Sequence, residues 1–167
     1  METDLQEWRG PGGLAPPPID LALLEPDLAP NVGAVIRLGA CLGLPVHVIE
    51  PCGFPFSAAA WRKQALDYAA LAEIHRHASW EAFRGATDGR RLLAFTTRAP
   101  RPLAQVAFRP GDVLLFGRES AGLPEAAHAA AEERVVIPLR PGARSLNVAM
   151  AAAIAAGEAV RQLGGQA

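Results

Sequence analysis

Short runs rich in valine, isoleucine and leucine alternate along this chain with segments whose apolar residues repeat at helical spacing. Strands separated by helices are typical of a mostly parallel sheet with helices on both faces. We therefore predict an α/β fold whose ligand site lies at the carboxyl ends of the strands. The expected strands are 19–24, 46–50, 72–75, 91–95, 112–116 and 134–138, and the expected helices are 30–43, 58–68, 79–86, a short helix after Pro124, and 145–163.

The chain has 167 residues, which is the length of one ordinary domain, and its 50% hydrophobic content excludes a wholly disordered class. Residues 1–18 end in the tract GPGGLAPPP, so we predict a flexible glycine- and proline-rich arm followed by a single domain over 19–167. The first residues lack the apolar segment of a secretory signal, and no apolar run approaches the about 20 residues of a membrane span. These features favour a cytoplasmic protein without membrane contact.

Neither the net charge nor the cysteines and histidines indicate a particular ligand. The formal net charge is -1, so any contact with nucleic acid must come from local basic patches. Cys41 and Cys52 match no zinc or disulfide framework. His75 and His77 would point the same way on a strand, but no further ligand completes a set, so we predict no metal site.

The segment EPDLAPNVGAVIRLGACLG follows the first expected strand. We predict Asn31 as the N-cap of the next helix. Arg37 lies one turn after Gly33, and helical side chains lean towards the N-terminus, where unpaired N–H groups favour an anion. The pattern predicts a site for an RNA phosphate or a developing alkoxide; the alternative is a capped surface helix with a solvated arginine.

A second strand-to-helix loop, GRESAGLP, contains Gly117, Glu119, Gly122 and Pro124. It has neither the lysine of a Walker loop nor a dinucleotide fingerprint, which argues against a phosphate cradle. We expect the glycines to let a ligand approach the backbone, and Glu119 to bind a cationic group or to hold Arg37. The alternative is a tight turn with a solvated acid.

A third loop leads from Pro138 into a long alanine-rich helix, for which we predict Ser145 as the N-cap. Arg144, Ser145 and Asn147 should therefore cluster at the N-terminus of this helix. Met150, Ile154, Gly157 and Val160 repeat along it at near-helical spacing. The pattern fits core packing and a subunit interface equally well.

Taken together, the three loops resemble the SPOUT superfamily, in particular its small bacterial tRNA wobble-nucleotide 2'-O-methyltransferases. The resemblance covers about Ile19 to Leu163. Its first motif is similar to Leu23, Glu25, Pro26, Asn31, Gly33 and Arg37, its second to Phe116, Gly117, Glu119, Gly122, Leu123 and Pro124, and its third to Ile137, Pro138, Arg144, Ser145, Leu146 and Asn147. Three motifs in this order form a far more specific signal than any one of them.

The resemblance implies a SPOUT α/β fold with a C-terminal trefoil knot and a homodimer that completes each RNA site. It implies S-adenosylmethionine as the cofactor, and the wobble nucleotide at position 34 of tRNA, as cytidine or a modified uridine in leucine tRNAs, as the methyl acceptor. The implied cofactor-binding residues are Phe95, Gly117, Ile137, Leu139, Ser145 and Leu146.

The expected reaction needs an oxygen nucleophile in line with the sulfonium methyl group and no metal. The resemblance implies that Arg37 activates the hydroxyl, and stabilising the alkoxide is the role we favour for it. Asn31, Glu119, Ser145 and Asn147 are expected to shape the site. Arg37, Arg62, Lys63 and Arg144 are expected to contact the anticodon stem-loop of the tRNA. For Arg62 and Lys63 the alternative is the solvated basic edge of an amphipathic helix.

One departure from the family pattern is Val148–Ala149–Met150 after Asn147, where the wobble enzymes have a serine and an asparagine. It leaves two alternatives open: a 2'-O-methyltransferase for another tRNA or rRNA position, and a noncatalytic RNA-binding or dimerisation module of the same fold.

Overall fold

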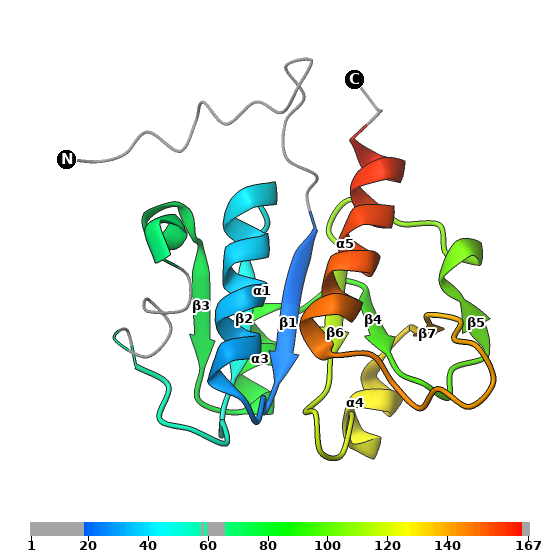
Figure 1. Cartoon of the computed structure of the whole chain (residues 1–167), viewed down its shortest axis with the longest axis horizontal. Coiled ribbons are helices and arrows are strands. Elements are labelled where there is room, and N and C mark those ends of the chain that lie inside the picture. The colour runs from blue at the N-terminus through cyan, green and yellow to red at the C-terminus, as the bar shows by residue number, and fades with distance from the viewer. Residues whose placement is uncertain (1–18, 58, 60–65, 165–167) are drawn as a thin grey trace.

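A computed structural model of the chain describes residues 19–57, 59 and 66–164, which form one sheet with helices on both sides (Figure 1). The strands are β1 (Asp20–Leu24), β2 (Val46–Ile49), β3 (Ile74–His77), β4 (Leu92–Phe95), β5 (Arg101–Pro102), β6 (Val113–Phe116) and β7 (Glu133–Val136). The helices are α1 (Ala29–Leu42), η2 (Leu66–Leu71), α3 (Trp80–Ala86), η3 (Leu103–Gln105), α4 (Glu125–Ala130) and α5 (Val148–Leu163).

The strands follow the order β3-β2-β1-β6-β4-β7-β5, and every pair of neighbours is parallel. This confirms the predicted parallel α/β sheet. Since all strands run the same way, the loops that follow β1, β4, β6 and β7 leave the sheet at one edge. The three motif loops and the loop after β4 are therefore neighbours, although they are far apart in the sequence.

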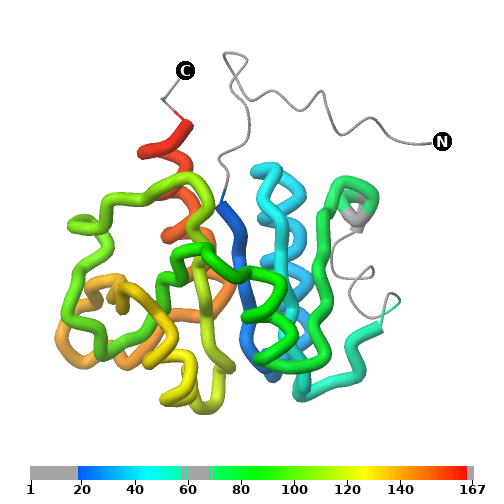
Figure 2. The backbone as a smooth tube through the Cα atoms, turned by 180° about the vertical axis from the view of Figure 1, so that it is seen from behind, coloured from blue at the N-terminus to red at the C-terminus, as the bar shows by residue number. Residues whose placement is uncertain are grey.

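The strands β1, β2, β4 and β6 send alternate side chains into two separate apolar cores. Leu21 and Leu23 of β1 pack beneath α1 and α5, whereas Ala22 and Leu24 pack on the opposite face with Phe83 of α3 and with α4. Figures 1 and 2 show these two layers from the front and from behind. The predicted placement of helices on both faces is confirmed.

Some predicted elements differ from those in the structure. The strand predicted at 72–75 is β3, which begins and ends two residues later. The two-residue edge strand β5 and the one-turn helix η3 were not predicted, because such short elements leave no periodic pattern. Most of the helix predicted at 58–68 lies outside the described residues, as does the arm over residues 1–18.

Both predicted caps at the motif loops were wrong. α1 begins at Ala29 after Leu28, because Pro30 fits the first helical turn, where its missing N–H costs nothing. α5 begins at Val148, and its cap is Asn147, whose Oδ1 accepts hydrogen bonds from two backbone N–H groups. Ser145 is thereby left in the preceding loop, and the side chain of Asn31 is left free for other partners.

None of the helices among the described residues is long and apolar enough to cross a membrane. The threading of the C-terminal segment into a trefoil knot stays a prediction from the resemblance.

Candidate functional site

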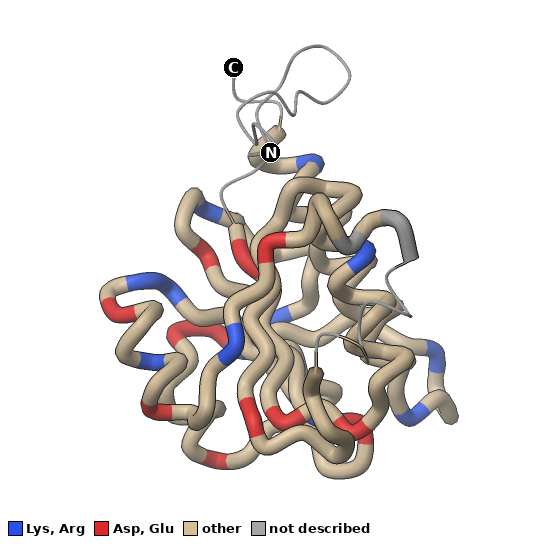
Figure 3. The backbone as a smooth tube through the Cα atoms, turned by 90° about the vertical axis from the view of Figure 1, so that its left-hand side faces the viewer, with Lys and Arg blue, Asp and Glu red and all other residues tan. Residues whose placement is uncertain are grey.

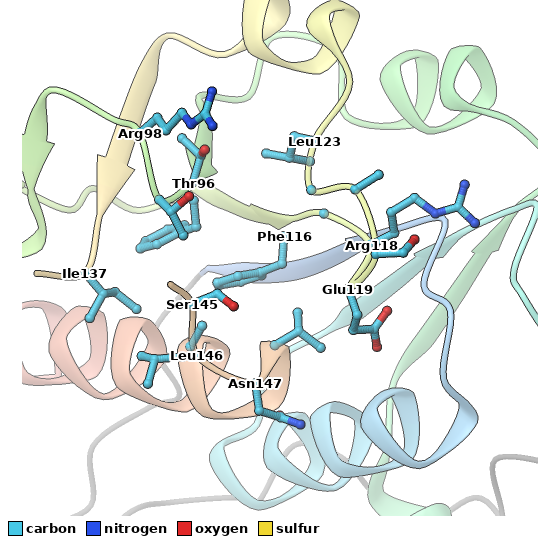
Figure 4. A pocket seen from close by; sticks show the side chains of 18 of the residues that line it. Thr96, Arg98, Phe116, Arg118, Glu119, Leu123, Ile137, Ser145, Leu146 and Asn147 are labelled. Atoms are coloured by element: carbon cyan, nitrogen blue, oxygen red, sulfur yellow. The ribbon is translucent and has the colours of Figure 1, made fainter. Parts of the chain in front are cut away.

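A cavity of about 790 Å³ lies at the carboxyl ends of β1, β4, β6 and β7. The loops after these four strands line it, so the three motif loops share one site (Figure 4). All six residues expected to bind the cofactor are among its lining residues: Phe95, Gly117, Ile137, Leu139, Ser145 and Leu146. The position at this edge of the sheet is the one predicted from the strand pattern.

The floor of the cavity is apolar. The rings of Phe95 on β4 and Phe116 on β6 stack with their centroids 4.9 Å apart. Leu123 and Ile137 add aliphatic surface beside them. A planar aromatic group can pack on such a floor, while the surrounding backbone N–H and C=O groups supply hydrogen bonds that fix its orientation.

The loop after β6 is closed by its own backbone. Arg118 and Gly122 form an antiparallel bridge in which the Gly122 N–H donates to the Arg118 carbonyl at 2.8 Å. A Cβ atom on Gly117 would lie 2.3 Å from the Gly122 carbonyl carbon. Gly117 is therefore required by the turn itself, and because it also lines the cavity, the approach of a ligand to its backbone stays a prediction.

A chain of polar side chains joins the three motif loops. Asn147 Nδ2 donates to Asn31 Oδ1 at 3.0 Å, and Asn31 Nδ2 donates to Glu119 Oε1 at 2.7 Å. Asn147 Oδ1 accepts from the Ala149 and Met150 N–H groups at the start of α5. We call Glu119, Asn31 and Asn147 the amide chain. Because the carboxylate of Glu119 only accepts, it sets the orientation of both amides.

Next to the amide chain, Asp27 and Glu119 each accept a hydrogen bond from a backbone N–H of the other's loop. The Asp27 N–H donates to Glu119 Oε2 at 2.8 Å, and Asp27 Oδ2 accepts from the Ser120 N–H at 2.9 Å. Arg118 donates from Nε and Nη2 to Asp27 Oδ1, and from Nη1 to Glu25. Hydrogen bonds from Ser120 and Arg118 lower the pKa of Asp27 to about 2. The loop after β1 is thereby fixed to the loop after β6.

Arg37 is not among the residues that line the cavity of its own chain. Its guanidinium lies 4.7 Å from the centroid of the Tyr68 ring, on the exposed face of α1, rather than at the start of the helix. The expectation that Glu119 holds Arg37 is wrong, because both Glu119 oxygens accept from the loop after β1 and from Asn31.

The residues expected to contact RNA are only partly described. Arg144 is exposed in the loop between β7 and α5, while Arg62 and Lys63 lie outside the described residues. Asp27 and Arg118, which fix the loops, were not singled out from the sequence. Both could have been found from the sequence, because each lies directly beside motif residues, in EPD and in GRE.

On α5, the alanines pack in the core, whereas the predicted repeat of Met150, Ile154 and Gly157 faces outward. Five alanines face the core: Ala149, Ala152, Ala155, Ala156 and Ala159. Met150 and Ile154 are 55% and 44% exposed, and a Cβ atom on Gly157 would meet no neighbour within 4 Å. The outward face of α5 is thus apolar and open.

Three of the four histidines gather under α3, while His128 lines the cavity. His47 stacks on both His75 and His77, and its Nε2 lies 2.8 Å from the Asp20 carboxylate. Among the described residues, no three side chains are grouped so as to hold a metal ion.

Comparison with protein families adds to this geometry. Residues 18–157 match the model of the SpoU rRNA Methylase family. A protein from Beijerinckia indica named tRNA (cytidine(34)-2'-O)-methyltransferase is 53% identical over 146 residues, which cover 86% of this chain and 91% of that protein.

Solved structures show the same arrangement. One that concerns the 2'-OH methylation of C/U34 on tRNA has a TM-score of 0.86 and 41% identity, and the match covers 91% of this chain and 100% of that one. An AdoMet-bound rRNA methyltransferase from Sinorhizobium meliloti has a TM-score of 0.79 at 23% identity, covering 98% of this chain and 62% of that one. The latter shows a likeness of fold alone.

Proposed function

Because the chain belongs to the SpoU rRNA methylase family, we propose that it methylates the ribose 2'-hydroxyl of the wobble nucleotide, position 34, of tRNA. The acceptor is cytidine or a modified uridine, with leucine tRNAs as the expected substrates. The observation that carries the proposal is the amide chain, which brings all three motif loops to the edge of one apolar cavity. Since the substrate is tRNA, we place the reaction in the cytoplasm.

S-adenosylmethionine fits the cavity as the methyl donor. The apolar floor at Phe95, Leu123 and Ile137 offers a surface on which the adenine can pack, and the loops around Gly117, Leu139 and Leu146 offer backbone groups for its polar edge. When bound, the cofactor supplies an electrophilic methyl group. The contribution of the chain is to hold donor and acceptor in line, which accounts for a large part of the acceleration in such transfers.

The amide chain positions the acceptor side of the site. Glu119 is engaged by two N–H donors, so its role is to orient Asn31 and Asn147 rather than to take the proton of the hydroxyl. Asn147 also caps α5, so the partly positive N-terminus of this helix lies beside the cavity. An oxygen that gains negative charge is stabilised at such a place.

A second copy of the chain brings Arg37 to the site in this proposal. α1 and α5 cover the same face of the sheet, and their outward faces carry Arg37 on one helix and exposed Met150 and Ile154 on the other. Exposed Leu28 and Leu146 continue this apolar surface to the cavity. A homodimer that buries the surface places Arg37 of one protomer towards the cavity of its partner, where the guanidinium stabilises the alkoxide.

Purified protein, labelled S-adenosylmethionine and a leucine tRNA transcript with cytidine at position 34 test the reaction. We expect one labelled 2'-O-methylcytidine per tRNA by mass spectrometry of nucleosides. A tRNA with 2'-deoxycytidine at position 34 should accept no label, while one with a deoxynucleotide at position 33 should remain a substrate. Label in rRNA with none in tRNA would reject the proposed acceptor.

Mixed dimers test the placement of Arg37. Arg37→Ala chains are expected to be nearly inactive, and Glu119→Gln chains to keep about 1–10% of the wild-type activity. If Arg37 acts in the partner's cavity, each mixed dimer has one intact site, and random mixing restores about a quarter of the wild-type activity. If it acts in its own chain, no mixed dimer has an intact site and the activity does not rise above that of the separate variants.

A further inference from the structure

Two stretches that lie side by side at the cavity contain arginines and no acidic residue. Residues 96–111 and 135–157 include Arg98, Arg140 and Arg144, and neither stretch contains Asp or Glu. β4 and β7 are neighbours in the sheet, with Phe95 paired to Val135, so the loops that follow them leave together. Both loops supply lining residues of the cavity.

These three arginines, unlike Arg101, have no side-chain partner among the described residues; Arg109 is unpaired too, but it lies next to Asp112 at the opposite ends of the strands. Arg98, Arg140 and Arg144 are exposed, and no hydrogen bond or ion pair engages their side chains within the part of the chain that the structure describes. Arg101, in the same stretch as Arg98, pairs with Glu133 at 3.2 Å. An arginine without a carboxylate partner is available to form an ion pair with an incoming anion.

Charge is therefore divided across the cavity. Arg98 and Arg118 lie on opposite sides of it, with Phe116 between them (Figure 4). The side of Arg118 is occupied by Glu25, Asp27 and Glu119, whose carboxylates repel phosphate. The side of the molecule at β3 shows no such division, because acidic and basic positions are mixed there (Figure 3).

We propose that Arg98, Arg140 and Arg144 form an arginine rim that binds the phosphates of the RNA next to the target nucleotide. Arg144 was expected to contact RNA from its motif, and the geometry adds Arg98 and Arg140. The inference rests on the proposed function and deepens it, because it states from which side of the cavity the RNA backbone approaches. The flanking phosphates lie over the loops after β4 and β7, and only the target ribose reaches the amide chain beside the loops after β1 and β6.

The dependence of tRNA binding on salt tests the arginine rim. Each phosphate contact that is lost reduces the slope of log K against log salt by about 0.7 to 0.9. The double variant Arg98→Gln/Arg140→Gln is expected to lose about twice that slope, with a raised KM for a leucine tRNA transcript. Its kcat at saturating tRNA and its Kd for S-adenosylmethionine, measured by calorimetry, should stay at the wild-type values.

Arg101→Gln is the matched control, because it removes one positive charge from the same edge at an exposed arginine that already has a carboxylate partner. Its salt slope should equal that of the wild type. Equal slopes for the double variant and wild type would overturn the rim. So would weaker binding of S-adenosylmethionine with an unchanged slope, which would assign Arg98 to the cofactor carboxylate. A wild-type protein that methylates no tRNA would instead reject the proposed function.

Discussion

Ion pairs between arginine and aspartate lie at both the amino and the carboxyl ends of the strands, but their side chains are exposed to different degrees. At the amino ends of the strands, Arg91 binds both oxygens of Asp112 and also reaches Glu133, and Arg91 and Asp112 are 14% and 1% exposed. At the carboxyl ends, Arg118 binds one oxygen of Asp27, and both side chains are more accessible to water. We call Asp20, Arg90, Arg91, Asp112 and Glu133 the amino-end cluster.

The difference in exposure indicates different roles for the two groups of ion pairs. A buried ion pair has lost its water, so removing one partner leaves an uncompensated charge in the interior. An exposed pair is screened by solvent, and little of the stability of the protein depends on it. We therefore assign stability to the amino-end cluster and the geometry of the reaction to Asp27, Arg118 and the amide chain.

The largest expected effect is on stability, from Asp112→Asn. Asp112 accepts two hydrogen bonds from Arg91 and one from the Arg109 N–H, and asparagine has a single oxygen to offer. We expect the free energy of unfolding to fall by about 3–5 kcal/mol in urea titrations. Glu158→Gln, in an exposed pair on α5, serves as the control. A change of the same size in both variants would remove the distinction between the edges.

Next comes Glu119→Gln, which we expect to lower kcat/KM by about 10- to 100-fold while the unfolding midpoint stays near that of the wild type. Two donors, the Asp27 N–H and Asn31 Nδ2, need two acceptor oxygens, and glutamine presents an NH₂ group to one of them. Glu125→Gln removes a nearby exposed carboxylate and should keep full activity. Loss of stability in place of activity would assign the amide chain to the scaffold.

A smaller effect should appear as a pH dependence of stability. Asp20, His47 and His77 form a hydrogen-bonded row beneath Phe83, beside His75 and Arg90. Burial, and then the neighbouring His47, lower the pKa of His77 below its ordinary value of 6.5.

The sign follows from proton binding. Below about pH 6.5 the unfolded chain binds a proton at His77 that the folded chain binds less well, so stability falls as pH falls. Unfolding measured between pH 7 and 5 should show this slope in the wild type and a shallower one in His77→Gln. An unchanged slope in the variant would place the titrating group elsewhere.

The smallest effect is expected for Arg161→Gln. Arg161 pairs with Glu158 on the surface of α5, and its side chain is 70% exposed. Methyl transfer and the unfolding midpoint should both stay within the error of measurement. A clear loss of activity would mean that the proposed dimer surface on α5 extends from Met150 and Ile154 as far as Arg161.

The sequence predicted the parallel sheet, its two helical layers and the gathering of the motif loops, because apolar periodicity reports which faces are buried. The caps at the starts of α1 and α5 were not predicted. Asn31 looks like a cap in its local context, but its amide binds Glu119, which is 88 positions away. Arg37 was misplaced for a related reason, since its contact with Tyr68 comes from a separate segment.

The hydrogen bond between Asn31 and Asn147 spans 116 positions of the chain, and it has a consequence for synthesis. While the ribosome is still adding the last strand, the segment that closes the site does not yet exist. A nascent or truncated polypeptide therefore holds no competent centre, even if its early strands have already paired. Only a finished molecule can modify RNA, so incomplete products of translation stay catalytically silent.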